Sequence, residues 1–195
     1  MAEEHSVTEE EAVPYSSIPK RISEYREQEY WQKRYEHEKG STYDWLLSYE
    51  RVKGLLLPHL QPHHRILNLG CGNSTLSEGL YTDSFKSICN IDYSLTVFAM
   101  AGRHPSREQL VMDMRELSTS LPADSFYIVI DMASLDAICT DGGSQWNPSE
   151  ELRSDVSRVC DGVLHVLKSG GLYQHLLWSA SLQEAPHGEI FSVVP

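Results

Sequence analysis

The chain is poor in basic residues: its 195 residues include 16 lysines and arginines against 28 aspartates and glutamates, a formal net charge of −12. An acidic surface repels phosphate backbones and anionic lipid headgroups, which excludes a nucleic-acid-coating or membrane-surface role and favours a basic partner. The length suits one domain, and a hydrophobic share of 41% argues against a wholly disordered chain.

Cysteine is also scarce. Cys71, Cys89, Cys139 and Cys160 form no C-x-x-C pair, so neither a zinc knuckle nor a disulfide framework is indicated. The pattern is typical of reduced thiols inside the cell, and we expect a cytoplasmic location, with the nucleus left open. The N-terminus has no secretory h-region, and no apolar run approaches the ~18 residues that span a bilayer.

Composition divides the chain into four segments. The first is acidic and contains two prolines, which predicts a flexible tail. The second places aromatic residues among charges in two helical patterns, over 22–37 and 43–57, which predicts a helical lid. The segments are 1–20 (acidic tail), 21–62 (lid), 63–180 (core) and 181–195 (C-terminal tail).

Short apolar runs alternate with helical patterns through the core. This alternation predicts an α/β domain whose parallel sheet is covered on both faces. Strands are expected at 65–69, 86–92, 110–112, 126–131 and 172–178, and helices at 75–81, 94–103 and 148–167.

A glycine turn follows the first strand. Gly70 and Gly72 flank Cys71 where the ligand crevice of a doubly wound sheet opens, and a side chain there would block a nucleotide-like ligand. Asp92 ends the second strand, where a carboxylate can accept hydrogen bonds from both ribose hydroxyls of an adenosine. Together these features favour a nucleoside site over a simple tight turn, and Cys71 is expected only to pack.

The absence of two motifs narrows the choice of ligand. The dinucleotide fingerprint G-x-G-x-x-G needs a small third residue where this chain has Thr75, and the Walker triplet Gly-Lys-Ser/Thr does not occur. We therefore expect an adenosine without phosphates, which S-adenosylmethionine fits. Aromatic faces attract a cation by about 0.5–2 kcal/mol. Trp31, Tyr35, Tyr43 and Trp45 could cover its sulfonium or could only pack the lid on the sheet.

Two other kinds of site are less well supported. His59, His63 and His64 lie among prolines that break any helix aligning them, so we expect solvated loop histidines and no metal. Ser74 and Ser134 lack the G-x-S-x-G elbow of a hydrolase.

Six stretches occur in a familiar order and spacing: EYWQKRY (29–35), YDWLLSYE (43–50), RILNLGCGNSTLSEGLY (65–81), NIDYS (90–94), VMDMREL (111–117) and SFYIVIDMASLDAI (125–138). On these stretches, the chain resembles the elongation-factor-1-alpha lysine methyltransferases and the methyltransferase-like proteins around them. The resemblance covers about residues 25–178. It implies a Rossmann-like class I fold, S-adenosylmethionine as cofactor and methylation of a protein lysine.

The resemblance also implies which residues hold the cofactor. They are Trp31, Tyr35 and Trp45 over it, Gly70 and Gly72 beside its methionine portion, Asp92 at the ribose, Tyr93 and Met114 at the adenine ring, and Asp113 at the adenine amine. Two further carboxylates, Asp131 and Asp136, are implied at the methyl-transfer site. Either could accept a proton from a substrate lysine or orient its amine. The alternative for Asp131 is that it only caps the loop after the fourth strand.

The chain departs from the family pattern in two places. Relatives carry D-K-G-T-L-D where this chain has DMASLD (131–136), which leaves the substrate open. The segment after the fifth strand is too short for a further helix and strand pair, so we expect a five-stranded parallel sheet whose exposed edge a partner could cover. The charge would steer a basic protein such as a translation factor. Alternatives are an N- or O-methyltransferase of a small molecule or peptide, an inactive cofactor-binding module, and an NAD-dependent oxidoreductase, which Thr75 disfavours.

Overall fold

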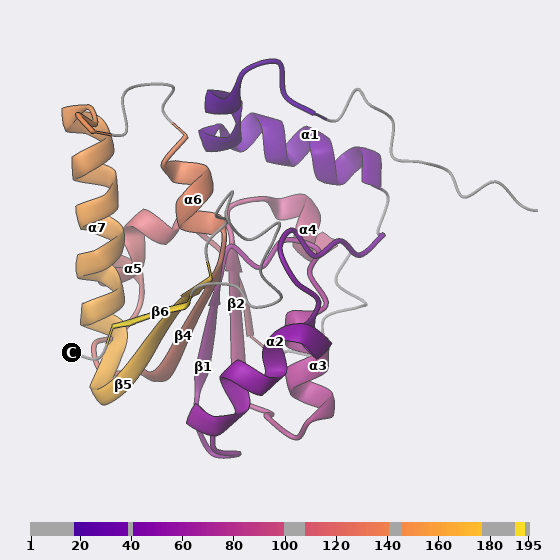
Figure 1. Cartoon of the computed structure of the whole chain (residues 1–195), viewed down its shortest axis with the longest axis vertical. Helices are drawn as coiled ribbons and strands as arrows, with labels where there is room; N and C mark the ends of the chain where they lie inside the picture. Colours follow the sequence, from indigo (N-terminus) through magenta and orange to yellow (C-terminus); the bar gives the residue numbers. More distant parts are fainter. Residues whose placement is uncertain (1–17, 39–40, 100–107, 141–145, 177–189, 194–195) are drawn as a thin grey trace, which may run out of the picture.

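A single mixed sheet forms the centre of the molecule, with helices on both faces (Figure 1). The computed structural model describes residues 18–38, 41–99, 108–140, 146–176 and 190–193. The strand order is β3-β2-β1-β4-β5-β6, in which β1 to β5 are parallel and β6 is antiparallel to β5. The strands are β1 (Ile66–Leu69), β2 (Ile88–Asp92), β3 (Glu108–Val111), β4 (Phe126–Met132), β5 (Leu167–Leu176) and β6 (Ile190–Val193).

Helices follow most of the strands, as the predicted α/β alternation requires. They are η2 (Ile22–Arg26), α1 (Gln28–Glu38), α2 (Tyr49–Leu56), η3 (Leu57–His59), α3 (Leu76–Thr82), α4 (Leu95–Ala99), η5 (Met114–Glu116), α5 (Leu117–Ser120), α6 (Ser134–Ile138) and α7 (Glu150–Val166). None of the helices in the described ranges is long and apolar enough to cross a membrane.

The central strands β1, β2 and β4 are buried on both faces because alternate side chains enter two separate cores. On β1, Ile66 packs with α2 and α3, whereas Leu67 and Leu69 pack with α5 and α7. The longest helix, α7, begins at Ser149, whose hydroxyl accepts a hydrogen bond from the Leu152 amide at 3.1 Å. Its apolar stripe then covers one face of β4 and β5.

The C-terminal edge differs from the prediction. The five parallel strands are present as predicted, but the expected exposure of β5 is wrong, because β6 pairs with it from Tyr173↔Val193 to Leu176↔Ile190. Most of the expected tail over 181–195 lies outside the described residues. The prediction assumed that covering this edge takes a helix and a strand pair. One returning strand of four residues is enough, so the structure gives no need for a partner at the edge of β5.

The lid is less helical than predicted. The pattern over 22–37 is interrupted at Glu27, which separates η2 from α1, and the pattern over 43–57 becomes helical only at Tyr49. The helix begins at Tyr49 because Ser48 before it is extended, with ψ of +158°. Further back, the Tyr43 amide donates to the Asn73 carbonyl at 3.1 Å. Several predicted features lie outside the described residues: most of the acidic tail, the end of the helix over 94–103 and the last residues of the strand over 172–178.

Ala133 joins β4 to α6 with a left-handed φ of +67°. A non-glycine residue in this region is strained by about 1–2 kcal/mol. Glycine removes the strain, but part of the gain in stability is lost because glycine has more conformational freedom in the unfolded chain. We expect Ala133→Gly to raise the free energy of unfolding by up to ~1 kcal/mol in urea melts. Ala137→Gly, within α6, should lower it by about 1 kcal/mol. Equal destabilisation by both variants would contradict this account of the strain.

Candidate functional site

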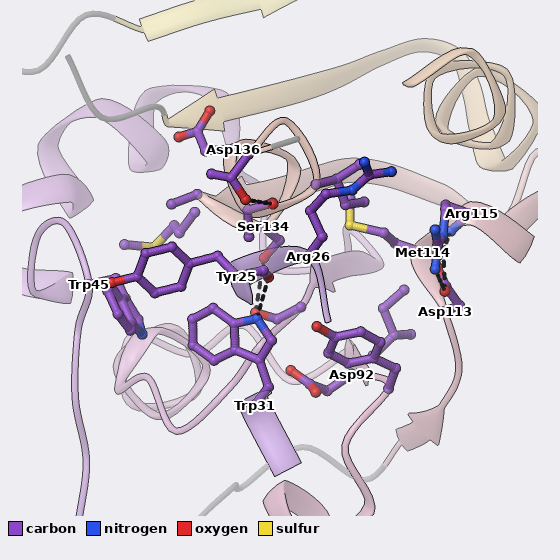
Figure 2. Close-up of a pocket in the computed structure, with 18 of the residues that line it drawn as sticks. Tyr25, Arg26, Trp31, Trp45, Asp92, Asp113, Met114, Arg115, Ser134 and Asp136 are labelled. Carbon is purple, nitrogen blue, oxygen red and sulfur yellow. Dashed lines mark hydrogen bonds and ion pairs between the residues drawn. The ribbon is translucent and has the colours of Figure 1, made fainter. Parts of the chain in front are cut away.

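A cavity of about 510 Å³ opens where the parallel strands end, beneath the aromatic residues of the lid (Figure 2). Ligand crevices in open α/β sheets lie at this carboxyl edge. Of the eleven residues predicted for the site, nine line it: Trp31, Tyr35, Trp45, Gly70, Asp92, Tyr93, Asp113, Met114 and Asp136. Gly72 and Asp131 lie just behind the wall, in contact with residues that form it.

The glycine turn passes too close to its neighbours for any side chain. Gly70 and Gly72 have φ of +56° and +48°. A Cβ on Gly70 would lie 2.2 Å from the Ser134 hydroxyl oxygen, and one on Gly72 would lie 2.8 Å from the Tyr35 hydroxyl oxygen. Cys71 between them is buried, and burial raises the pKa of its thiol well above the ordinary value, as suits a packing residue.

Asp92 is fixed by this turn. Its two carboxylate oxygens accept hydrogen bonds from the amides of Gly72 and Ser94, each at 2.9 Å. Burial raises the pKa of Asp92 to about 6, although the amide hydrogen bonds oppose the rise. Because each carboxylate oxygen can accept a second hydrogen bond, Asp92 retains acceptors for two hydroxyl groups of a ligand in the cavity.

The lid aromatics both pack together and line the cavity. The ring of Trp31 lies 5.2 Å from that of Trp45 and 5.8 Å from that of Tyr35. Its indole nitrogen donates to the Tyr25 carbonyl at 2.7 Å, and the Arg34 guanidinium lies over Trp45 at 4.4 Å. Packing of the lid and covering of a sulfonium are therefore compatible roles for these residues, because a packed aromatic cluster can also face a cation.

A chain of charges that the sequence reading missed joins the lid to the opposite wall. Both carboxylate oxygens of Asp113 accept from Arg115, which also reaches Asp155 on α7 at 2.8 Å. Arg26 of η2 binds the same Asp155 carboxylate at 3.2 Å. Burial raises the pKa of Asp113, but the hydrogen bonds from Arg115 outweigh this effect and lower it. An acid on the apolar stripe of the helix over 148–167 was the signal that could have revealed Asp155.

A second missed residue, Asp44, occupies the start of α3. Its carboxylate accepts from the Thr75 amide at 3.0 Å, the Thr75 hydroxyl at 2.7 Å and the Ser74 hydroxyl at 2.6 Å. In dinucleotide-binding folds the corresponding helix start receives the pyrophosphate. A carboxylate already held there repels a phosphate, which agrees with the phosphate-free ligand predicted from Thr75.

The two carboxylates predicted to be catalytic have different surroundings. Asp136 lines the cavity, whereas Asp131 is fully buried. The contacts of Asp131 match the alternative in which it holds the following loop, since it accepts from the amides of Ser134 at 2.8 Å and Leu135 at 3.2 Å. A catalytic role for either carboxylate stays a prediction, and Asp136 is the one placed to meet a substrate.

The histidines near the end of the lid take ordinary structural places. The ring of His64 stacks on Tyr127 with centroids 4.5 Å apart, and His59 is exposed at the end of η3. Within the described ranges, no three or more His, Cys, Asp or Glu side chains are arranged so that they could hold a metal ion.

Comparison with known proteins agrees with the resemblance seen in the sequence. No protein-family model matches the chain. The chain is 36% identical over 161 residues to EEF1A lysine methyltransferase 4 of Mus musculus, covering 80% of this chain and 62% of that protein. It is 35% identical to the Bos taurus protein of the same name, covering 84% and 65%. The chain thus spans less than two thirds of the length of these curated relatives.

Solved structures show the fold. A putative S-adenosyl-L-methionine-dependent methyltransferase from Methanococcus maripaludis matches with a TM-score of 0.52 and 14% identity, over 81% of this chain and 65% of that one. A phosphoethanolamine N-methyltransferase 2 of Haemonchus contortus, solved with S-adenosylhomocysteine, matches with a TM-score of 0.53 and 14% identity, over 86% and 40%. The predicted Rossmann-like class I methyltransferase fold is confirmed.

Proposed function

We propose that this chain is an S-adenosylmethionine-dependent methyltransferase whose acceptor is a lysine of a protein. The observation that carries the proposal is the buried Asp92 carboxylate, which faces the cavity between the glycine turn and the aromatic lid. The start of α3, where a dinucleotide would place its phosphates, is filled by Asp44. The relatives named as EEF1A lysine methyltransferases support lysine as the acceptor.

Different cavity residues would contact different parts of the cofactor. Asp92 would accept from the ribose hydroxyls, Tyr93 and Met114 would enclose the adenine, and Trp31 and Trp45 would face the sulfonium. The absent Cβ of Gly70 leaves room beside the methionine portion. When bound, S-adenosylmethionine supplies an activated methyl group with a neutral thioether as leaving group.

Asp136 would act on the acceptor. A lysine with an ordinary pKa of ~10.4 must lose a proton before its lone pair can attack. Asp136 could orient the ammonium group and receive that proton, and the apolar Met132 and Ile138 at the same wall would desolvate the amine. The N–C bond then forms as the C–S bond breaks. Alignment of the three atoms is worth at most ~7–11 kcal/mol of the barrier.

The net charge of −12 supports a basic protein substrate, which long-range attraction would steer to the enzyme. A translation factor related to the substrate named for the relatives fits this description.

We also propose a cytoplasmic location, where such a factor works. Fractionation of cells that express a tagged chain tests this location.

The direct test is transfer of a radiolabelled methyl group from S-adenosylmethionine. Purified elongation factor 1-alpha, whole-cell lysate, and a panel of small amines and phenols are incubated separately with wild type and with Asp92→Ala. We expect label on lysine in the protein samples with wild type alone. Label confined to the small molecules would overturn the lysine assignment, and cofactor binding without any transfer would favour an inactive module.

The pH dependence of cofactor binding should follow Asp92. Its pKa is raised from 3.8 to about 6 on folding, so the folded protein holds this proton more tightly than the unfolded chain. Stability from this group is therefore greatest at low pH and falls as pH rises through that interval. Because the ionised carboxylate accepts from both ribose hydroxyls, the Kd for S-adenosylhomocysteine should fall several-fold from pH 5 to pH 7. The same titration of Asp92→Asn should show no such change.

A further inference from the structure

His175 lies between the two carboxylates of the transfer site and has no part in the predictions from sequence. It belongs to β5, where it pairs in register with Asp131 on β4. Its Nδ1 lies 3.0 Å from Asp131 Oδ2, and its Nε2 lies 3.4 Å from Asp136 Oδ1. The three side chains thus lead from a fully buried acid, through a largely buried imidazole, to an acid at the cavity wall.

The inner end of this arrangement is rigid. Besides His175, Asp131 accepts from the amides of Ser134 and Leu135 and from the Tyr173 hydroxyl at 3.1 Å. A carboxylate with this many donors has one orientation, so the imidazole bonded to it has one as well. The ring of Tyr173 stacks beside the imidazole with centroids 6.1 Å apart, which limits its rotation.

The charges around the imidazole favour its doubly protonated form. Burial lowers the pKa of His175, but Asp131, Asp136 and their hydrogen bonds outweigh burial and raise it to about 9. The groups that face the ring are Asp131 from β4, Asp136 from α6 and Tyr173 from β5 itself. At neutral pH both ring nitrogens therefore carry a proton, one toward each carboxylate.

We propose that His175 is a positioning residue for methyl transfer: anchored on Asp131, it holds the Asp136 carboxylate at the cavity wall in the orientation that receives the acceptor amine. This inference rests on the proposed function and extends it to a residue of β5. His175 exchanges no proton with the substrate. The proton leaving the acceptor goes to Asp136 and then to solvent, while the imidazolium keeps Asp136 in place.

Two substitutions of His175 test its contact with Asp131 and its contact with Asp136 separately. An asparagine amide reaches as far as Nδ1 and can still bind Asp131, whereas a glutamine amide reaches as far as Nε2 and can still bind Asp136. We expect His175→Asn to lower kcat/KM for the acceptor about tenfold or more and His175→Gln to lower it less. The Kd for S-adenosylhomocysteine should change less than about twofold in both, because His175 lies outside the cofactor wall. His59→Asn, at an exposed histidine of η3, is the matched control.

The pH profile distinguishes positioning from packing. In wild type, kcat/KM should fall as His175 loses its second proton near pH 9, and neither variant should show that alkaline limb. Independently of activity, NMR titration of the imidazole should give a lower pKa in Asp136→Asn than in wild type. This second measurement holds even if His175→Asn fails to fold.

Three results would overturn the proposal. A His175→Asn enzyme with the activity and pH profile of His59→Asn would remove the positioning role alone. If the pKa of the imidazole does not respond to Asp136→Asn, the contact between His175 and Asp136 is absent. If wild type transfers no methyl group to any acceptor although the contact between His175 and Asp136 is present, the proposed function is wrong and so is the positioning role.

Discussion

Replacing Asp92 with alanine is expected to weaken binding of S-adenosylhomocysteine by at least ~2 kcal/mol, which is about 30-fold in Kd. The carboxylate is buried in the cavity wall, and its loss would leave the ribose hydroxyls of the proposed cofactor without their acceptor. Isothermal titration calorimetry measures the change directly. An Asp92→Ala protein that binds within about threefold of wild type would contradict the assigned role.

The alanine variant also needs a test of folding, because Asp92 accepts from the amides of Gly72 and Ser94. Each buried amide left without an acceptor costs about 1–3 kcal/mol. Asp92→Asn is the matched control, since its carbonyl oxygen keeps one acceptor and the shape of the side chain. We expect it to be more stable than the alanine variant and intermediate in affinity. Urea melts of the three proteins separate the loss of binding from the loss of fold.

Replacing Gly70 with alanine is expected to lower the free energy of unfolding by about 3 kcal/mol and to reduce cofactor binding with it. The left-handed φ of +56° costs about 1–2 kcal/mol for alanine. The new Cβ would also lie 2.7 Å from Ser134 Cβ, a collision that adds about 1–3 kcal/mol. Chemical denaturation measures the sum of the two costs.

Two further variants separate strain from collision. Gly170 also has a positive φ, of +75°, but no atom within 4 Å of the position of a Cβ, so Gly170→Ala should cost only about 1 kcal/mol. Ser134→Gly removes the colliding atoms, and the double variant Gly70→Ala with Ser134→Gly should recover part of the loss. If the single variants add without any recovery, the collision has been wrongly identified.

The sheet was predictable because its signals are local. Apolar runs that end in Gly70 and Asp92 locate the ends of β1 and β2, and parallel strands bring those ends to one edge. Most of the predicted cofactor residues therefore line the cavity. The predicted helix over 43–57 was too long because the chain is extended at Ser48, and Tyr43 and Asp44 bond to the segment that follows the glycine turn. Periodicity along the chain cannot show such contacts.

What the sequence did not reveal depends on pairs distant in the chain. Asp155 on α7 binds Arg26 of the lid, and His175 on β5 binds Asp131 on β4. The acid on the apolar stripe of α7 marks Asp155 as unusual but does not name its partner, and the role of His175 appears only when β4 and β5 are placed in register. The β6 pairing was missed for a similar reason, because a short strand after a long intervening segment carries little periodicity of its own.

Calorimetric titration with S-adenosylhomocysteine, and separately with NADH, shows whether the cavity takes a phosphate-free adenosine. We expect one S-adenosylhomocysteine bound per chain, no measurable heat with NADH, and affinity that depends on Asp92. Tight binding of NADH, with none of S-adenosylhomocysteine, would contradict this expectation.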